Sequence, residues 1–245
     1  MKRIVWIALL FIAPGVAAQT GKFPPDSLIN THVIPHNTPV PQVVAMMRDF
    51  AGNLGVRCQF CHVGEGNALA QFDFASDQKR TKVVARQMML MVQEVNRRID
   101  TLPGRPDPMM KVTCATCHRG TSRPIPLDQL VGNDAVGAGA DSAIRAYRAL
   151  RTRYYGRDAY DFGEQSLIGA SRRAAQAGKQ EAALALLAVN EEFFPNSSAS
   201  AVARANVFLV RNDTASAVAA LRAALARDST STDARGRLRQ LGQQP

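Results

Sequence analysis

Two copies of the pattern Cys-x-x-Cys-His constrain this chain more than any other feature. They read CQFCH at residues 58–62 and CATCH at residues 114–118, and together they use all four cysteines. Two thiols at this spacing can each add to a haem vinyl group, and the histidine beside the second thiol can then bind the iron. The pattern therefore predicts two covalently bound haem c groups. Their expected attachment residues are Cys58, Cys61, Cys114 and Cys117, and their expected iron ligands are His62 and His118.

A zinc site or disulfides are the alternative uses of four cysteines. The cysteine pairs of zinc ribbons usually lie roughly 15–20 residues apart. Here residues 62–113 separate the two pairs. Neither alternative explains why a histidine follows each pair, and so haem attachment is the favoured interpretation.

The N-terminus has the layout of a secretory signal peptide. Lys2 and Arg3 precede a short apolar run at residues 4–13, and small residues follow up to Ala18. We expect cleavage after Ala18, with the mature protein in the periplasm, either free or on a membrane complex. An uncleaved anchor is the alternative, but the run is shorter than the roughly 20 residues that span a bilayer.

Methionines are candidates for the second axial ligand of each iron. Residues 40–52 and 78–99 have the periodicity of helices, and Ser76 or Asp77 is the expected N-cap of the second. One face of the first comprises Val43, Met47, Phe50, Ala51 and Leu54, and one face of the second comprises Val84, Met88, Met91, Val95 and Ile99. Met89 points away from the second face. Periodicity alone leaves each methionine as either a packing residue or a ligand.

Six short stretches of this region together match the motifs of a known family. They are residues 46–47, 54–56, 58–62, 74–77, 81–88 and 112–120. With them, residues 43–124 resemble the cytochrome subunit of photosynthetic reaction centres. In that family a helix precedes each Cys-x-x-Cys-His motif, and a methionine on the helix is the distal ligand of most haems. The resemblance implies that Met47 pairs with His62 and Met88 with His118, with Met46 and Met91 as the respective alternatives.

The resemblance has limits. The family subunit carries four haems, one of them with a second histidine ligand, whereas this chain has two motifs and no match to that histidine. The resemblance therefore implies a haem unit that relays electrons, and it identifies neither a photosynthetic host nor a partner. Two alternatives remain for His32 and His36. They are exposed or capping residues, or one of them reaches a haem. Arg119 is either a propionate partner or a solvated side chain.

The C-terminal part has a different organisation. Prolines and glycines predict a linker at residues 122–140, followed by a helix at 141–154. Residues 178–187 realign onto 212–221 with the 34-residue offset of tetratricopeptide repeats. The expected division is a signal peptide (1–18), a dihaem cytochrome domain (19–127), a linker and helix (128–160), and tetratricopeptide-like hairpins (161–245). These repeats either dock a protein partner, mediate self-association, or only stabilise the fold.

The sequence predicts an all-α protein that carries single electrons between redox proteins and is not an enzyme. The net charge of +10 argues little for nucleic acid, because an exported protein does not meet it and haem propionates would offset much of the charge. A basic surface can steer a protein to an acidic redox partner. The alternatives are a dihaem enzyme of the peroxidase kind and a haem-based redox or gas sensor, both of which need an open iron face.

Overall fold

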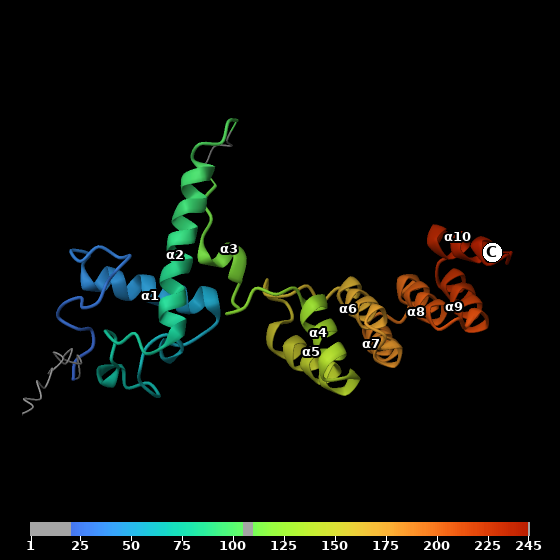
Figure 1. Ribbon diagram of the computed structural model, residues 1–245, viewed down its shortest axis with the longest axis horizontal. Helices are drawn as coiled ribbons and strands as arrows, with labels where there is room; N and C mark the ends of the chain where they lie inside the picture. The colour runs from blue at the N-terminus through green and yellow to red at the C-terminus, as the bar shows by residue number, and fades with distance from the viewer. Residues whose placement is uncertain (1–20, 105–109, 245) are drawn as a thin grey trace, which may run out of the picture. The chain divides into compact units, whose positions relative to one another are not determined.

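A computed structural model of the chain describes residues 21–104 and 110–244. Over these residues the chain is all α, as the sequence predicts: ten α-helices and two short 3-10 helices are present, and strand pairing is limited to one isolated bridge between Val63 and Asp73 (Figure 1). The predicted signal peptide, residues 1–18, lies outside the described residues. None of the described helices is long and apolar enough to cross a membrane.

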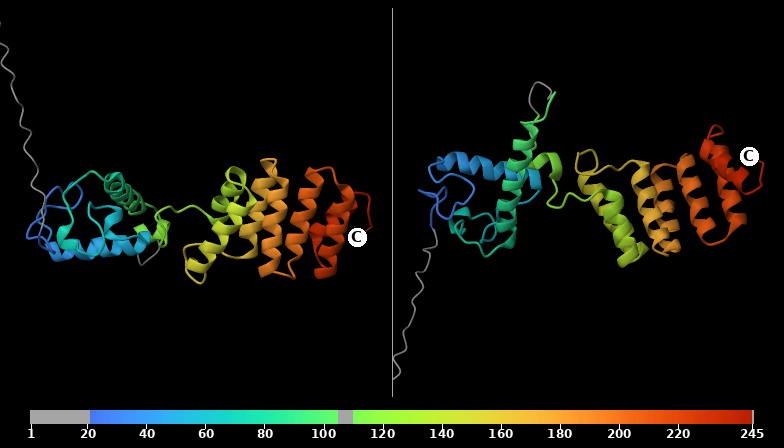
Figure 2. Two further views of the ribbon diagram at one scale, coloured as in Figure 1. Left: turned by 90° about the horizontal axis from the view of Figure 1, so that it is seen from below. Right: turned by 45° about the horizontal axis from the view of Figure 1, so that its top comes forward.

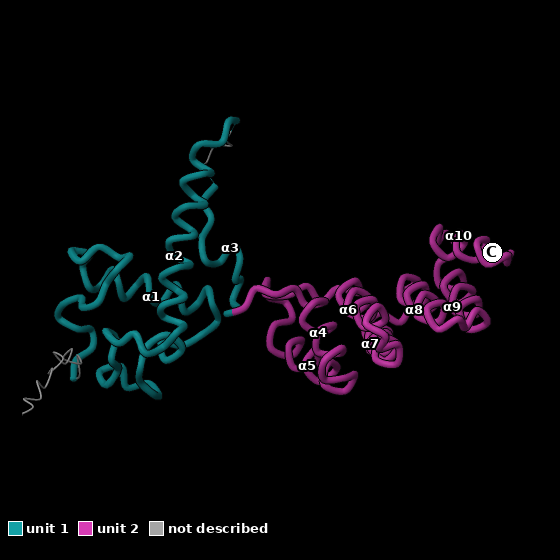
Figure 3. The backbone as a smooth tube through the Cα atoms, in the orientation of Figure 1, with its two compact units in different colours: residues 1–122 teal, residues 123–245 magenta. Residues whose placement is uncertain are grey.

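The chain divides into two compact units, residues 1–122 and 123–245, called unit 1 and unit 2 (Figure 3). Unit 1 contains both Cys-x-x-Cys-His motifs. Its elements are α1 (Val40–Leu54), η1 (Cys58–Phe60), η2 (Leu69–Gln71), α2 (Arg80–Ile99) and α3 (Cys114–His118). Prolines flank the first residue of α1, and Gly55 ends this helix in a left-handed conformation with φ of 62°.

The start of α2 differs from the expectation that Ser76 or Asp77 caps it. The helix begins at Arg80 and has no side-chain cap. The Asp77 carboxylate instead forms ion pairs with Lys82 at 3.1 Å and Arg86 at 2.9 Å. These ion pairs hold the preceding segment against the first two turns of the helix.

The apolar core of unit 1 is small. Among the described residues its buried apolar side chains are Val43, Phe72 and Ala75. None of the 20 residues of α2 is buried. Because a small domain depends on burying enough apolar surface, protein contacts alone leave unit 1 weakly stabilised.

Unit 2 is a row of helices packed on their neighbours (Figure 2). Its described helices are α4 (Leu127–Gly137), α5 (Ala140–Tyr154), α6 (Glu164–Gln176), α7 (Gln180–Phe193), α8 (Ser198–Val210), α9 (Thr214–Arg227) and α10 (Thr232–Gln240). A continuous apolar core joins α4 to α7, and a second cluster joins α8 to α10. Unit 2 therefore has a substantial core of its own.

The predicted linker at residues 122–140 is wrong over most of its length, because α4 occupies 127–137. Leu127, Val131 and Ala135 recur at helical spacing and are buried. Gly132 is a packing position: a Cβ there would lie 3.2 Å from Ala170 Cα, so glycine lets α4 approach α6 closely.

The hairpins of unit 2 repeat with the period that the sequence predicts. Helix α6 begins at Glu164 and α8 at Ser198, 34 residues later, and α7 and α9 begin at Gln180 and Thr214, again 34 residues apart. Helix α5 corresponds to the helix expected at 141–154, and it packs on α4 and α7. Assignment of these hairpins to the tetratricopeptide repeats stays a prediction.

Candidate haem-binding sites

The first motif forms a tight turn. The N–H groups of Cys61 and His62 both donate to the Cys58 carbonyl, at 3.2 and 2.9 Å. Cys58 and Cys61 form no disulfide. The turn therefore presents two thiols directly before His62, which is the arrangement that thioether attachment needs.

Aromatic rings shield one side of His62. The Phe74 ring meets the imidazole edge-on, with the two ring centroids 5.0 Å apart, and Phe74 in turn contacts Phe72 and Phe23 at 5.7 and 5.6 Å. Phe72 is fully buried and lies so close to Gly64 that a Cβ there would be 2.4 Å from its ring. The rings exclude water from this side of the first motif.

The environment of His62 favours the neutral imidazole. Burial lowers the pKa of His62 to about 4, with a further lowering from the charges of Lys82 and Arg86 that Asp73 opposes. The nearby Phe74 backbone also opposes this lowering of the pKa. It does not form a full hydrogen bond, because His62 Nδ1 has no hydrogen-bond partner among the described residues. A neutral imidazole is the form that binds a metal ion.

The second motif is a short helix, α3, with a capping box at its start. The Thr113 N–H donates to Thr116 Oγ1 at 3.0 Å. The His118 ring donates from Nδ1 to the Thr121 carbonyl at 2.9 Å. This bond fixes the tautomer and leaves Nε2 as the nitrogen with a free lone pair, as in most metal-binding histidines. Arg119 is exposed, and its expected pairing with a propionate stays a prediction.

Helix α2 connects the two motifs. Near its start, the Thr81 hydroxyl donates to the Phe60 carbonyl within the first motif. Near its end, the Asn96 amide exchanges two hydrogen bonds with the Val112 backbone, both at 2.8 Å. Because Val112 lies two residues before Cys114, α2 runs from one motif to the other (Figure 1).

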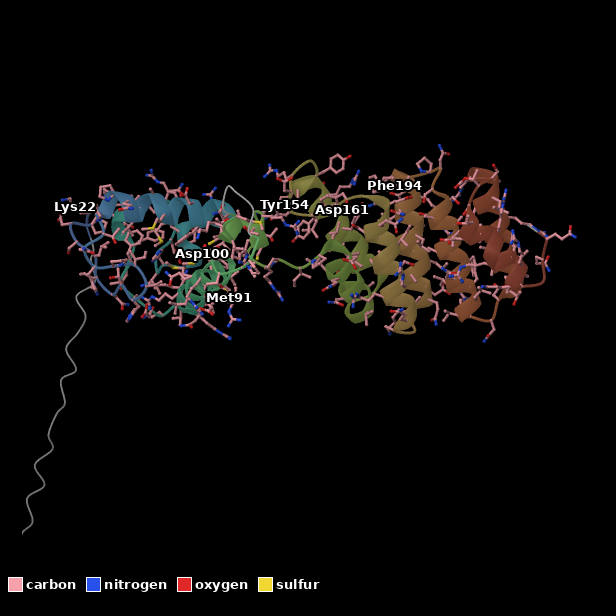
Figure 4. The ribbon with its side chains drawn as sticks, turned by 90° about the horizontal axis from the view of Figure 1, so that it is seen from above. Lys22, Met91, Asp100, Tyr154, Asp161 and Phe194 are labelled. Carbon is pink, nitrogen blue, oxygen red and sulfur yellow. The ribbon has the colours of Figure 1, made fainter. Side chains whose placement is uncertain are left out.

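One broad side of α2 is apolar and is not covered by the described protein. Its residues are Val83, Val84, Met88, Leu90 and Met91, which are between 38% and 49% exposed. Figure 4 labels Met91 on this helix. Soluble proteins rarely expose a contiguous apolar surface without a function. An apolar side next to two thiol pairs and two histidines fits a flat, largely apolar haem.

Polar side chains on another side of α2 hold the helix to the rest of unit 1. Lys82, Arg86 and Asn96 are among those that make these hydrogen bonds. Met89, which the periodicity places away from the apolar face, is less exposed than Met88. Polar side chains determine the orientation of the helix, whereas periodicity only locates its apolar stripe. The predicted ligand Met88 and its alternative Met91 therefore lie on the uncovered side.

The predicted ligand Met47 and its alternative Met46 are half-buried on α1. This helix approaches the second motif: the Gly120 N–H donates to the Asn53 carbonyl at 2.9 Å, and α1 packs on α3. The C-terminal end of α1, which follows Met47, is thus fixed to the turn after His118. Which methionine pairs with which histidine stays a prediction.

The two other histidines belong to the N-terminal arm. His32 Nε2 lies 2.7 Å from Asn30 Oδ1, and His36 Nδ1 lies 2.9 Å from Thr31 Oγ1. Both side chains are exposed. Their exposure agrees with the expectation of exposed or capping residues. That either histidine reaches a haem stays a prediction. Asn30 itself, which the sequence did not single out, accepts a hydrogen bond from Arg86 at its carbonyl, at 2.8 Å.

Replacing Asp77 with asparagine is expected to destabilise unit 1 at neutral pH and to have less effect in acid. Hydrogen bonds from Arg86, then Asn30 and Lys82, hold the pKa of Asp77 well below its usual range. A carboxylate with a lowered folded-state pKa contributes stability above its ordinary pKa of about 4, and this contribution is lost as pH falls through the folded-state value. Thermal unfolding of both proteins at pH 7 and in acid measures this. A difference that stays constant in acid would contradict the ion-pair explanation.

The zinc and disulfide alternatives find no support in the geometry. None of the four cysteines forms a disulfide. Among residues 21–104 and 110–244, no group of three or more His, Cys, Asp or Glu side chains could hold a metal ion. The two cysteine pairs thus do not converge into one four-thiol site.

Residues 42–136 match the family model described as "Photosynthetic reaction centre cytochrome C subunit". The match includes both Cys-x-x-Cys-His motifs and confirms the resemblance found over residues 43–124. It supports covalently bound haem and a part in electron transfer. No curated protein matches the chain.

Proposed function

We propose that this protein is a periplasmic dihaem c-type cytochrome that passes single electrons between redox proteins. The observation that carries the proposal is the uncovered apolar side of α2, which runs between two Cys-x-x-Cys-His motifs. When bound, haem supplies a one-electron change between ferrous and ferric iron.

The chain contributes attachment, orientation and exclusion of water. Cys58, Cys61, Cys114 and Cys117 would form the thioether bonds, and His62 and His118 would bind the two irons. Met47 and Met88 are the proposed distal ligands. Two strong axial ligands on each iron leave no position for a substrate, and this property separates a carrier from an enzyme or a gas sensor.

The absorption spectrum of the reduced, purified protein, before and after addition of carbon monoxide, tests this function. Two haems per chain and a spectrum that carbon monoxide does not change are expected for an electron carrier. A shift of the spectrum would show that one iron face opens. That result would favour the dihaem enzyme or the haem-based sensor.

Met88→Ala is expected to lower the reduction potential of one site and to open it to carbon monoxide. Loss of a methionine ligand removes the interaction that raises the potential of His/Met iron. We expect at least a tenfold change in the reduction equilibrium, which is about 59 mV for one electron. Met91→Ala is the matched control, because both methionines lie on the same side of α2 and are similarly exposed.

Met47→Ala should have the same effect on the other site, with Met46→Ala as its control. An effect of the controls without an effect of Met47→Ala or Met88→Ala would reverse the ligand assignment.

We further propose that the C-terminal hairpins make a protein contact, either with a redox partner or with a second copy. Residues of α6, α8 and α10 line a groove of about 1180 Å³. Two of its side chains, Ser171 and Asn206, have a buried oxygen that has no hydrogen-bond partner among the described residues. Sedimentation of the full chain beside an Asn206→Arg variant tests self-association. A monomer at all concentrations would leave docking of a redox partner as the role.

A further inference from the structure

The two histidines that follow the cysteine pairs have different surroundings. His118 donates its Nδ1–H to the Thr121 carbonyl, whereas His62 Nδ1 is buried and makes no such bond within the described residues. A hydrogen bond at Nδ1 makes an imidazole a more electron-donating ligand and so favours the oxidised metal. On this ground alone, the His62 site is the more easily reduced of the two.

Backbone carbonyls hold Lys82 close to His62. The nearby acceptor, the Phe74 carbonyl, receives a hydrogen bond from Lys82 Nζ at 2.9 Å. The same ammonium group also donates to the carbonyls of Ala75 and Ser76, at 3.0 and 2.9 Å. These bonds hold the Lys82 ammonium group in place beside the Phe74 carbonyl, close to the His62 ring.

The Lys82 ammonium group is also a fixed positive charge. Its side chain is only 11% exposed, and Nζ is held by three carbonyls and by Asp77 at 3.1 Å. The charges that act on His62 are those of Lys82, Arg86 and Asp73, and Lys82 has the largest effect of the three. A buried positive charge is poorly screened by solvent. It disfavours the more positive, ferric state of an iron bound nearby and raises the reduction potential.

We propose that Lys82 is a redox-tuning residue that makes the His62 site the more oxidising of the two haem sites. The inference rests on the proposed function, because it assumes a haem at each motif. It adds a direction to the relay: an electron that enters at the His118 site moves to the His62 site and stays there until an acceptor removes it.

A redox titration of the holoprotein, followed by its absorption spectrum, tests the proposal. The wild type should show two separate one-electron steps. Lys82→Met should lower the higher potential and leave the lower one in place. We expect at least a tenfold change in the reduction equilibrium of the higher step, equivalent to about 59 mV. Lys179→Met, an exposed lysine in unit 2, controls for the loss of one charge anywhere in the chain.

Two further variants separate charge from hydrogen bonding and guard against misfolding. Lys82→Arg keeps the charge and should keep most of the higher potential. Lys82→Gln removes the charge but keeps hydrogen-bond donors, and it should lower the potential by part of the Lys82→Met shift. Coincident potentials in the wild type would overturn the inference, as would a Lys82→Gln variant of normal haem content with unchanged potentials. Fewer than two haems per wild-type chain would instead overturn the proposed function and, with it, this inference.

Discussion

Replacing all four cysteines with alanine is expected to unfold unit 1 and to leave unit 2 folded. Unit 1 has few buried apolar side chains of its own, and α2 leaves one whole side uncovered. Without thioether bonds, unit 1 loses its haem groups, the large apolar groups that would cover this side. The expected loss is the whole stability of the unit, roughly 5 kcal/mol or more. Unit 2 keeps its core, which extends through α4–α7 and α8–α10.

Hydrogen exchange of the full chain, read by segment, measures this result. Amides of α1 and α2 should lose protection in the four-cysteine variant, while those of α6 and α7 keep it and serve as an internal control. Variants that lack one pair, Cys58→Ala with Cys61→Ala or Cys114→Ala with Cys117→Ala, should fall between the extremes. Normal protection of α1 and α2 in the four-cysteine variant would show that unit 1 does not depend on haem.

Local features of the sequence predict much of the fold. Prolines at 39 and 41 and the glycine at 55 bracket α1, because each residue type suits one end of a helix. The 34-residue offset is reproduced in the helix starts of unit 2. The paired cysteines with a following histidine identify the site residues directly, because covalent haem attachment requires those groups at that spacing.

Features that depend on tertiary contacts could not be predicted. Periodicity locates an apolar stripe on α2 but does not say what covers it, and the contacts of Lys82, Arg86 and Asn96 orient this helix. Gly132 resembles a linker glycine in sequence, yet it permits a close helix contact with α6. In the same way, the hydrogen bond that distinguishes His118 from His62 comes from a backbone carbonyl, which has no sequence pattern.

Gly55→Ala is expected to disrupt the contact between α1 and the second motif. Gly55 has a φ of 62°, and a Cβ there would lie 2.1 Å from the Gly120 carbonyl oxygen. A left-handed conformation costs a residue with a Cβ about 1–2 kcal/mol. The overlap with backbone adds to this cost, because Gly120 would have to move and its 2.9 Å hydrogen bond to the Asn53 carbonyl would break. We expect a loss of roughly 2–4 kcal/mol in the free energy of unfolding of unit 1.

Denaturant unfolding of the holoprotein, followed at the haem absorption band, measures the effect of Gly55→Ala. Gly52→Ala is the matched control: this glycine lies on the same helix, and a Cβ there would meet nothing within 4 Å. Alanine at position 52 should be neutral or stabilise the helix by about 0.5–1 kcal/mol. Because Gly120 lies two residues after His118, Gly55→Ala should also perturb the spectrum of the His118 site more than that of the His62 site. Equal stability of the two variants, with unchanged spectra, would mean that α1 does not hold the second motif in place.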